Sequence, residues 1–168
     1  MAYQRLQVTR ALKVHKTTTS IDIPDPDFAG ITGTNATSAT KKLTVSAADT
    51  FTASTVEAGY IVENVTQGKY ALVSAIDTVA APNQGTQLSL SEDIFGTAGD
   101  TFQIYSQSTR GCILYVGGTG VLNVVTAAGD SVSYVGAPTG SFLPIQVVRV
   151  LSSLNGVATS ATDFIAHW

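Results

Sequence analysis

The stretch LNVVTAAGDSVSYVGAPTGSFLPIQVVRVL, residues 122–151, decides the fold class. Apolar Val132 and Tyr134 alternate with serines, which is the period of a strand with one face on a core. Residues 127–130 (AAGD) lie between two such segments and are typical of a tight hairpin turn. Residues 145–151 are apolar on both faces, which predicts a strand covered on both sides by a second sheet or by another subunit. The stretch therefore predicts antiparallel β-structure.

Arg149 lies inside this doubly apolar strand. An unpaired guanidinium is costly to bury. Two interpretations stay open: the head reaches solvent along its own stem at the strand end, or it pairs with an acidic group, which could lie across a subunit boundary.

The same alternation occurs near the N-terminus, at Leu6, Val8, Leu12 and Val14. Turn signals rich in Gly, Pro and Asn recur about every ten residues, which is typical of a sandwich or barrel. Almost no segment has helical spacing, and residues 152–162 are expected to form a loop because of Gly156 and the many Ser and Thr residues. The expected fold class is all-β and antiparallel.

Residues 17–40 change character, because Pro24 and Pro26 are followed by a run of Thr, Gly and Ala. This segment is expected to be an extended connector. Residues 41–105 resemble a compact unit of about five short strands. Their expected cores are Leu43 to Val45, Tyr60 to Val62, Tyr70 to Val73, Leu88 to Leu90 and Phe102 to Tyr105.

The expected organisation is therefore a discontinuous host domain with an insertion. Residues 1–27 and 109–168 form an antiparallel β-sandwich or barrel, and residues 28–108 hold the connector and a small β-barrel of about 36–106. A barrel of that size is marginal alone and would depend on its host for stability.

Composition excludes several classes. The chain has 168 residues, a net charge of -3, 44% apolar residues and only 12% charged residues. Disorder is disfavoured by this balance, no run is long enough to span a membrane, and an acidic chain of low charge is a poor nucleic-acid partner. The N-terminus lacks the apolar stretch of a signal peptide. A single cysteine forms no internal disulfide. The high Ser and Thr content suits a surface that packs against neighbours.

Basic residues gather near the N-terminus, where Arg5, Arg10, Lys13 and Lys16 occur without an acid in residues 1–21. They indicate either a solvated basic strand edge or an arm that docks on an acidic partner.

No catalytic set is recognisable. His15 and His167 lie near opposite ends of the chain; the first is expected at the surface and the second in interface packing. Residues 117–120 (GGTG) precede a strand rather than the helix that a phosphate loop needs, so they predict a tight turn. Cys112 is expected to be a small core residue.

Three acids cluster in residues 21–27 (IDIPDPD). Calcium favours several oxygen ligands in one loop, but the two prolines hold the segment extended and favour a solvated connector. We expect no catalytic, cofactor-binding or metal site, and no enzyme activity.

The C-terminal part resembles the head spike-base proteins of tailed phages and gene transfer agents. That family shows an LYV-like strand, a T-x-x-G-D-x-V hairpin, a Pro/Gly turn, an LP-V-x-V-x-R-V-L segment and an aromatic ending. The N-terminal RALKVHKTTTSIDIP is similar to its first strand and crossover. The matching residues are Thr126, Gly129, Asp130, Val132, Pro138, Gly140, Leu143, Pro144, Val147, Arg149, Val150, Leu151, Ile165, Ala166 and Trp168.

Residues 28–108 depart from that family, whose crossover leads almost directly to the LYV strand. Their pattern is similar to small β modules inside other phage virion proteins. The resemblance implies a virion structural protein on the capsid surface: a decoration, cement or spike-base protein that binds major capsid protein, assembles as a trimer or pentamer, and stabilises the shell or presents a fibre. The alternatives are a neck, tail or baseplate component, and a glycan-binding surface module.

Overall fold

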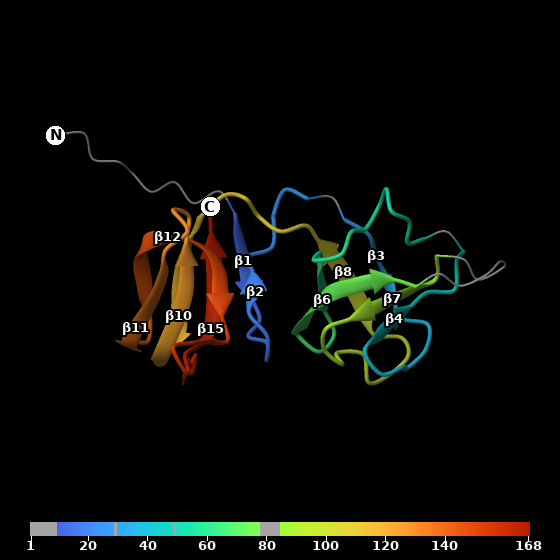
Figure 1. Cartoon of the computed structure of the whole chain (residues 1–168). Helices are drawn as coiled ribbons and strands as arrows, with labels where there is room; N and C mark the ends of the chain where they lie inside the picture. Colours follow the sequence, from blue (N-terminus) through green and yellow to red (C-terminus); the bar gives the residue numbers. More distant parts are fainter. Residues whose placement is uncertain (1–9, 29, 49, 78–84) are drawn as a thin grey trace. The chain divides into compact units, whose positions relative to one another are not determined.

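The computed structural model describes residues 10–28, 30–48, 50–77 and 85–168, and all its regular elements are strands (Figure 1). The predicted all-β, antiparallel fold class is confirmed. Arg5, Leu6 and Val8 lie outside the described residues, and so do residues 82–84 (PNQ), which belong to one of the recurring turn signals of the sequence.

The chain folds into two compact units. Within the described residues, unit 1 consists of 10–16, 20–26 and 108–168, and unit 2 consists of 17–19 and 27–107. Unit 1 is therefore built from both ends of the chain, with unit 2 as the intervening segment.

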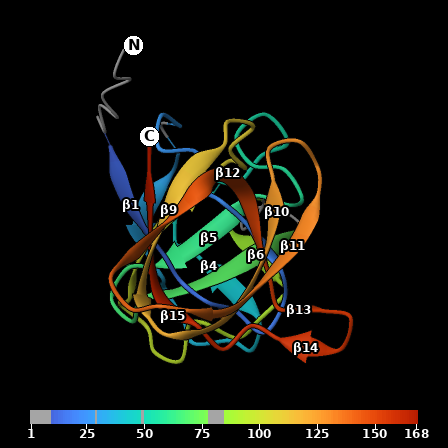
Figure 2. The ribbon, with the colours of Figure 1, turned by 90° about the vertical axis from the view of Figure 1, so that its left-hand side faces the viewer.

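Unit 1 is a curled antiparallel sheet, seen face-on in Figure 2. Its strand order is β1-β15-β9-β12-β10-β11, and the two-residue strand β2 also pairs with β12. The strands are β1 (Ala11–Val14), β2 (Ile21–Asp22), β9 (Cys112–Gly118), β10 (Gly120–Thr126), β11 (Ser131–Ala137), β12 (Ser141–Leu151) and β15 (Thr162–His167).

The inner face of this sheet carries the core of unit 1. Val14, Phe164 and Val116 pair across three adjacent strands, and the two last-named are fully buried. Directly paired residues share one face of an antiparallel sheet, so the alternation in the sequence places every second residue inside. The hairpin turn 127–130 lies where it is predicted. In the predicted turn 117–120, Thr119 alone lies between β9 and β10, and the other three residues belong to these strands.

The expected loop at 152–162 instead contains a small hairpin of β13 (Ser153–Leu154) and β14 (Val157–Ala158). Asn155 and Gly156 form its turn with φ of 51° and 80°, which is the backbone that a two-residue hairpin with right-handed twist requires.

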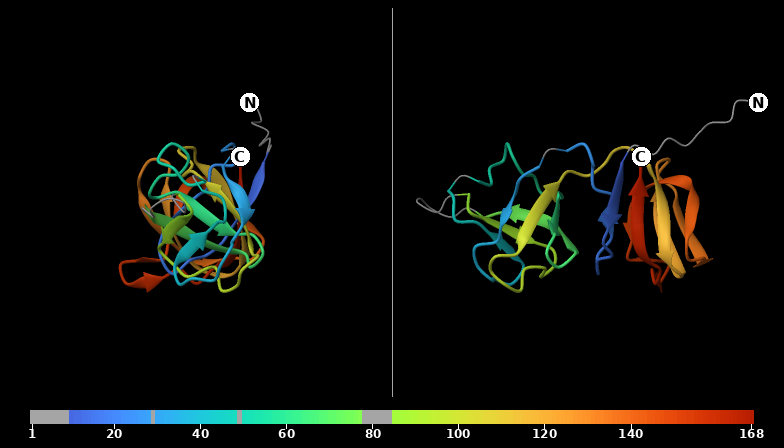
Figure 3. Two further views of the ribbon diagram at one scale, coloured as in Figure 1. Left: turned by 90° about the vertical axis from the view of Figure 1, so that its right-hand side faces the viewer. Right: turned by 180° about the vertical axis from the view of Figure 1, so that it is seen from behind.

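Unit 2 is a six-stranded antiparallel sheet in the order β3-β8-β5-β6-β7-β4 (Figure 3). Strands β3 and β4 are the first and last of this order. A hydrogen bond from Ala36 N, just after β3, to Thr44 O of β4 (2.8 Å) links the two edges of the sheet. The strands are β3 (Thr32–Thr34), β4 (Lys42–Thr44), β5 (Ile61–Asn64), β6 (Lys69–Ile76), β7 (Gln87–Leu90) and β8 (Thr101–Tyr105).

The expected barrel residues do form the core of unit 2. Leu43, Val62, Val73, Leu88 and Ile104 are buried together in one cluster. A network of hydrogen-bonded polar side chains also lies inside the unit.

Asp100 holds one corner of unit 2. Its carboxylate accepts hydrogen bonds from Asn64 Nδ2 (2.8 Å), Gln67 Nε2 (2.6 Å) and Thr97 Oγ1 (3.1 Å). The hydrogen bond from Asn64, with the others, lowers the pKa of Asp100, because donors stabilise the charged form. Asn35 is also buried and joins Thr44 to the chain near Thr97.

The predicted extended connector at residues 17–40 is wrong in part. Ile21–Asp22 forms β2 and Thr32–Thr34 forms β3, so this segment supplies a strand to each sheet. Ser108 N also donates to Ile23 O (2.8 Å). The points where the chain leaves and re-enters unit 1 are thus held beside each other within that unit.

Candidate functional site

The outer face of the unit 1 sheet carries a set of apolar and aromatic side chains. We call Ile113, Tyr115, Phe142, Ile165 and His167 the outer face. Ile165 pairs with Tyr115, Tyr115 pairs with Phe142, and His167 pairs with Ile113. They alternate with the buried inner residues of the same strands, so they point away from the core.

The aromatic rings of the outer face contact one another. Phe142 lies edge-to-face with Tyr115 and with His167, with ring centroids 5.3 Å apart in both pairs. Such contacts add to the area that each ring buries. Phe142 is nevertheless 53% exposed. The rings of this cluster therefore pack against one another, but the described part of the chain does not cover them.

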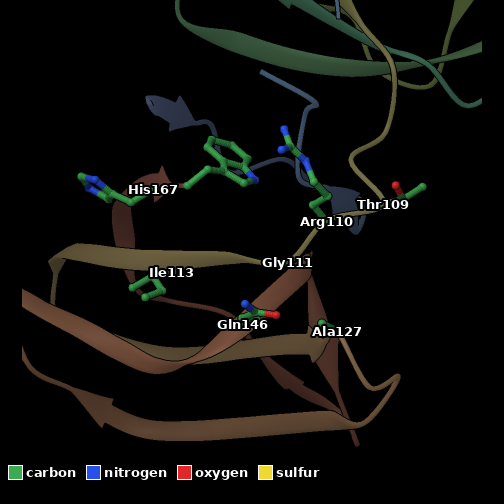
Figure 4. Close-up of a pocket in the computed structure, with 8 residues that line it drawn as sticks. Thr109, Arg110, Gly111, Ile113, Ala127, Gln146 and His167 are labelled. Atoms are coloured by element: carbon green, nitrogen blue, oxygen red, sulfur yellow. The ribbon is translucent and has the colours of Figure 1, made fainter. Parts of the chain in front are cut away.

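A pocket of about 500 Å³ opens in unit 1 at one end of this face (Figure 4). The lining residues come from the start of β9, the β10–β11 turn, β12 and the end of β15. They are Thr109, Arg110, Gly111, Ile113, Ala127, Gln146, His167 and Trp168.

Gly111 lets the chain before β9 pack closely against two residues of the pocket wall. A Cβ at this position would lie 2.6 Å from Gln146 Cβ and 3.0 Å from Ala127 Cβ, closer than carbon atoms pack. A larger residue at position 111 would therefore push Gln146 or Ala127 out of place, and Figure 4 shows the three residues beside one another.

Arg110 is the cationic group of the pocket. Its Nη2 lies 3.9 Å from Asp25 Oδ1, and its side chain is 57% exposed. In Figure 4 the guanidinium projects above the pocket while the imidazole of His167 points away from it. Gln146 and Thr109 are the other lining residues with polar, uncharged side chains.

The sequence-predicted acids of residues 21–27 are ion-pair partners. Asp22 pairs with Arg149 and Asp25 approaches Arg110. Among the residues that the structure describes, no group of three or more His, Cys, Asp and Glu side chains is arranged to hold a metal ion.

Cys112 is buried in the unit 1 core, as predicted, and burial raises the pKa of its thiol to about 12. His15 is half-buried just after β1, and His167 contacts Phe142. Arg10, Lys13 and Lys16 of the predicted basic segment are exposed. The docking-arm interpretation of that segment stays a prediction.

The described part of the chain covers one face of the strand that is expected to be covered on both, and cover of the other face by another subunit stays a prediction. Leu143, Val147 and Val150 of β12 are buried, whereas Val148 and Leu151 are only half-buried. The second apolar face of β12 is thus left partly accessible by the described part of the chain.

Strand β11 is one edge of the unit 1 sheet and contains no charged residue. Its register against β10 shifts between Gly120 and Leu122, at Val135 and Gly136. The bulge leaves Val135 84% exposed, and bulges of this kind twist an edge away from regular pairing.

Sequence reasoning did not single out the pocket. Arg110, Gln146 and Ala127 are far apart in sequence and carry no shared motif. The pairing of Gln146 with Ile113 and the hydrogen bond from Ala127 N to Gln146 O (2.9 Å) bring them together. The one available signal was the unusual Trp168 next to His167 at the end of a strand.

No family model, curated protein or solved structure matches the chain. Within the described residues there is no helix long and apolar enough to cross a membrane.

Proposed function

We propose that the chain is a structural protein of a tailed-phage virion: a decoration, cement or spike-base protein on the capsid surface that binds major capsid protein. The observation that carries this proposal is the outer face. Phe142 lies 53% exposed amid apolar neighbours on three adjacent strands. Contiguous apolar patches on a soluble domain mark interaction sites.

Unit 1 supplies the residues that resemble the spike-base family, and the outer face belongs to the same unit. Ile165 and Trp168 of the matching C-terminal pattern lie at the outer face and the pocket. The family resemblance and the accessible surface therefore coincide on one unit.

The low charge of the chain favours assembly. With 12% charged residues and a net charge of -3, like copies repel each other weakly. A homo-oligomer, a trimer or pentamer in this proposal, multiplies a weak single contact with the shell.

The test is to locate the chain in particles. A tagged full-length chain, produced during infection, is expected to co-purify with DNA-filled particles on a density gradient and to label the capsid surface in electron micrographs. Sedimentation of the purified chain should give a closed oligomer. Label confined to the neck, tail or baseplate would overturn the proposed location on the capsid surface. Absence of the chain from particles would overturn the proposal itself.

A further inference from the structure

We propose that the unit 1 pocket binds a neutral saccharide, a hexopyranose unit of a glycan. The apolar wall of the pocket would contact the C–H face of the sugar, and Arg110 and Gln146 would hydrogen-bond its hydroxyl groups. This inference goes beyond the proposed structural role and does not depend on it.

The size of the pocket fits a sugar. A volume of about 500 Å³ lies within the range of small-molecule sites. The pocket is partly open rather than enclosed, so a sugar can enter while the rest of a glycan chain continues outside.

The lining has the two-sided chemistry that a pyranose requires. A pyranose ring has an apolar face of C–H groups and a rim of hydroxyl groups. Trp168, Ile113 and Ala127 supply apolar wall, and an indole offers a large rigid apolar surface at low entropic cost.

Two polar residues of the lining, Arg110 and Gln146, have planar head groups. The guanidinium of Arg110 has five N–H donors in a fixed plane, and the amide of Gln146 both donates and accepts. A hydroxyl group also donates and accepts, so adjacent sugar hydroxyls match these side chains.

The charge balance favours a neutral ligand over an anion. Asp25 Oδ1 lies 3.9 Å from the Arg110 guanidinium, and its negative charge offsets the attraction that Arg110 would exert on a carboxylate. Hydrogen bonds to neutral hydroxyls lose little from this neighbour.

Trp168 makes the experiment specific, because it is the single tryptophan of the chain. Its emission therefore reports on this pocket in the full-length protein. We would titrate the protein with the methyl glycosides of glucose, mannose, galactose and N-acetylglucosamine, and separately with sodium glucuronate and sodium acetate, at low and high salt.

At least one neutral glycoside is expected to shift the emission saturably, with an affinity that high salt leaves unchanged. Gln146→Ala should weaken that affinity about five- to tenfold, the loss of one hydrogen bond. Gln103→Ala, the same change in β8 of unit 2, should leave it unchanged. Arg110→Gln gives a second pocket variant if Gln146→Ala does not fold by circular dichroism.

The proposal is overturned if all four glycosides are silent, or if both folded pocket variants bind as the wild type does. A response confined to glucuronate and acetate that falls with salt would also overturn it and make the pocket an anion site. Particle location is measured separately, so either proposal can fail alone.

Discussion

Arg149 and Asp22 form a bidentate ion pair between strands that lie far apart in the sequence. Arg149 Nε lies 2.6 Å from Asp22 Oδ1 and Nη2 lies 3.0 Å from Oδ2, and the two residues are register partners in β12 and β2. The hydrogen bonds that Arg149 donates to the Asp22 carboxylate raise the pKa of Arg149 above its ordinary value. The two interpretations from the sequence are thus both partly right: the head reaches solvent, and its acidic partner lies in the same chain.

Arg149→Met should lower the free energy of unfolding of unit 1 by about 1 kcal/mol, at the upper end for exposed pairs because the geometry is bidentate. The Arg149 side chain is 45% exposed, so solvent screening limits the effect. A double-mutant cycle with Asp22→Asn, followed by urea unfolding, measures the coupling. A coupling indistinguishable from zero would show that β2 is held by its backbone bonds alone.

Unit 2 should lose stability in acid. The pKa of Asp100 is lowered by its hydrogen bonds. For Asp77, burial is the largest influence and raises the pKa, but hydrogen bonds from Lys42 and Ser89 and the charge of Lys42 lower it overall. Because both carboxyls bind protons more weakly when folded, their stabilisation is present above the ordinary carboxyl pKa of about 4 and is lost as pH falls through the folded values.

Hydrogen exchange of unit 2 peptides between about pH 6 and pH 3, corrected for intrinsic rates, measures this loss. Asp100→Asn should weaken protection at neutral pH and flatten its pH dependence. The exposed turn variant Asp130→Asn in unit 1 is the control. If the pH profile of Asp100→Asn equals that of the wild type, Asp100 is not a source of the acid sensitivity of unit 2.

Gly120→Ala should destabilise unit 1 by about 2–3 kcal/mol, the range for a strained, overpacked backbone position. A Cβ there would lie 2.5 Å from Ala161 N and 2.7 Å from Ser160 C. Gly140 has φ of 78° but open space around it, so Gly140→Ala should cost only about 1 kcal/mol. Thermal unfolding measures the loss of stability in both variants. Equal losses would show that the close approach of Ala161 and Ser160 to Gly120 does not matter for stability.

Phe142→Ala should weaken self-association about tenfold or more if the outer face is an assembly surface, since exposed aromatic anchors dominate interfaces. Sedimentation velocity over a concentration series measures this. Val65→Ala removes a side chain of similar exposure, 52%, in unit 2 and should leave association unchanged. The same oligomer in both variants would place the contact elsewhere.

Cys112 should resist thiol reagents while unit 1 is folded. Its side chain is 1% exposed and its pKa is raised to about 12, so almost no thiolate is available for reaction. Because it is the single cysteine, its modification rate in increasing urea follows the opening of unit 1. Rapid modification in buffer would show that β9 opens locally.

The sequence predicts the fold class well because alternation with period two depends only on which side of a strand faces the core. It failed at β2 and β3, since strands of two and three residues are too short to show a period. It also predicts that residues 145–151 are covered on both faces by a second sheet or by another subunit, and the described part of the chain covers one face. Register shifts around Pro144 and Val148 interrupt the pairing of β12 with β9 and with β10.

The pocket could not be predicted for a different reason. Its polar groups are unremarkable alone, and the register between β12 and β9 brings Gln146 to Ile113. The partner of Arg149 was equally hidden, because three acids near Pro24 were candidates and 127 positions separate it from Asp22.

The hydrogen bond between Ser108 N and Ile23 O has a consequence for how such a chain can change over time. Since unit 1 itself pins the two attachment points together, the entropy of closing whatever loop joins them depends only weakly on its length. This site of unit 1 therefore tolerates insertions of different length. In a related protein another segment could replace residues 27–107 without a change in the unit 1 sheet, its outer face or its pocket.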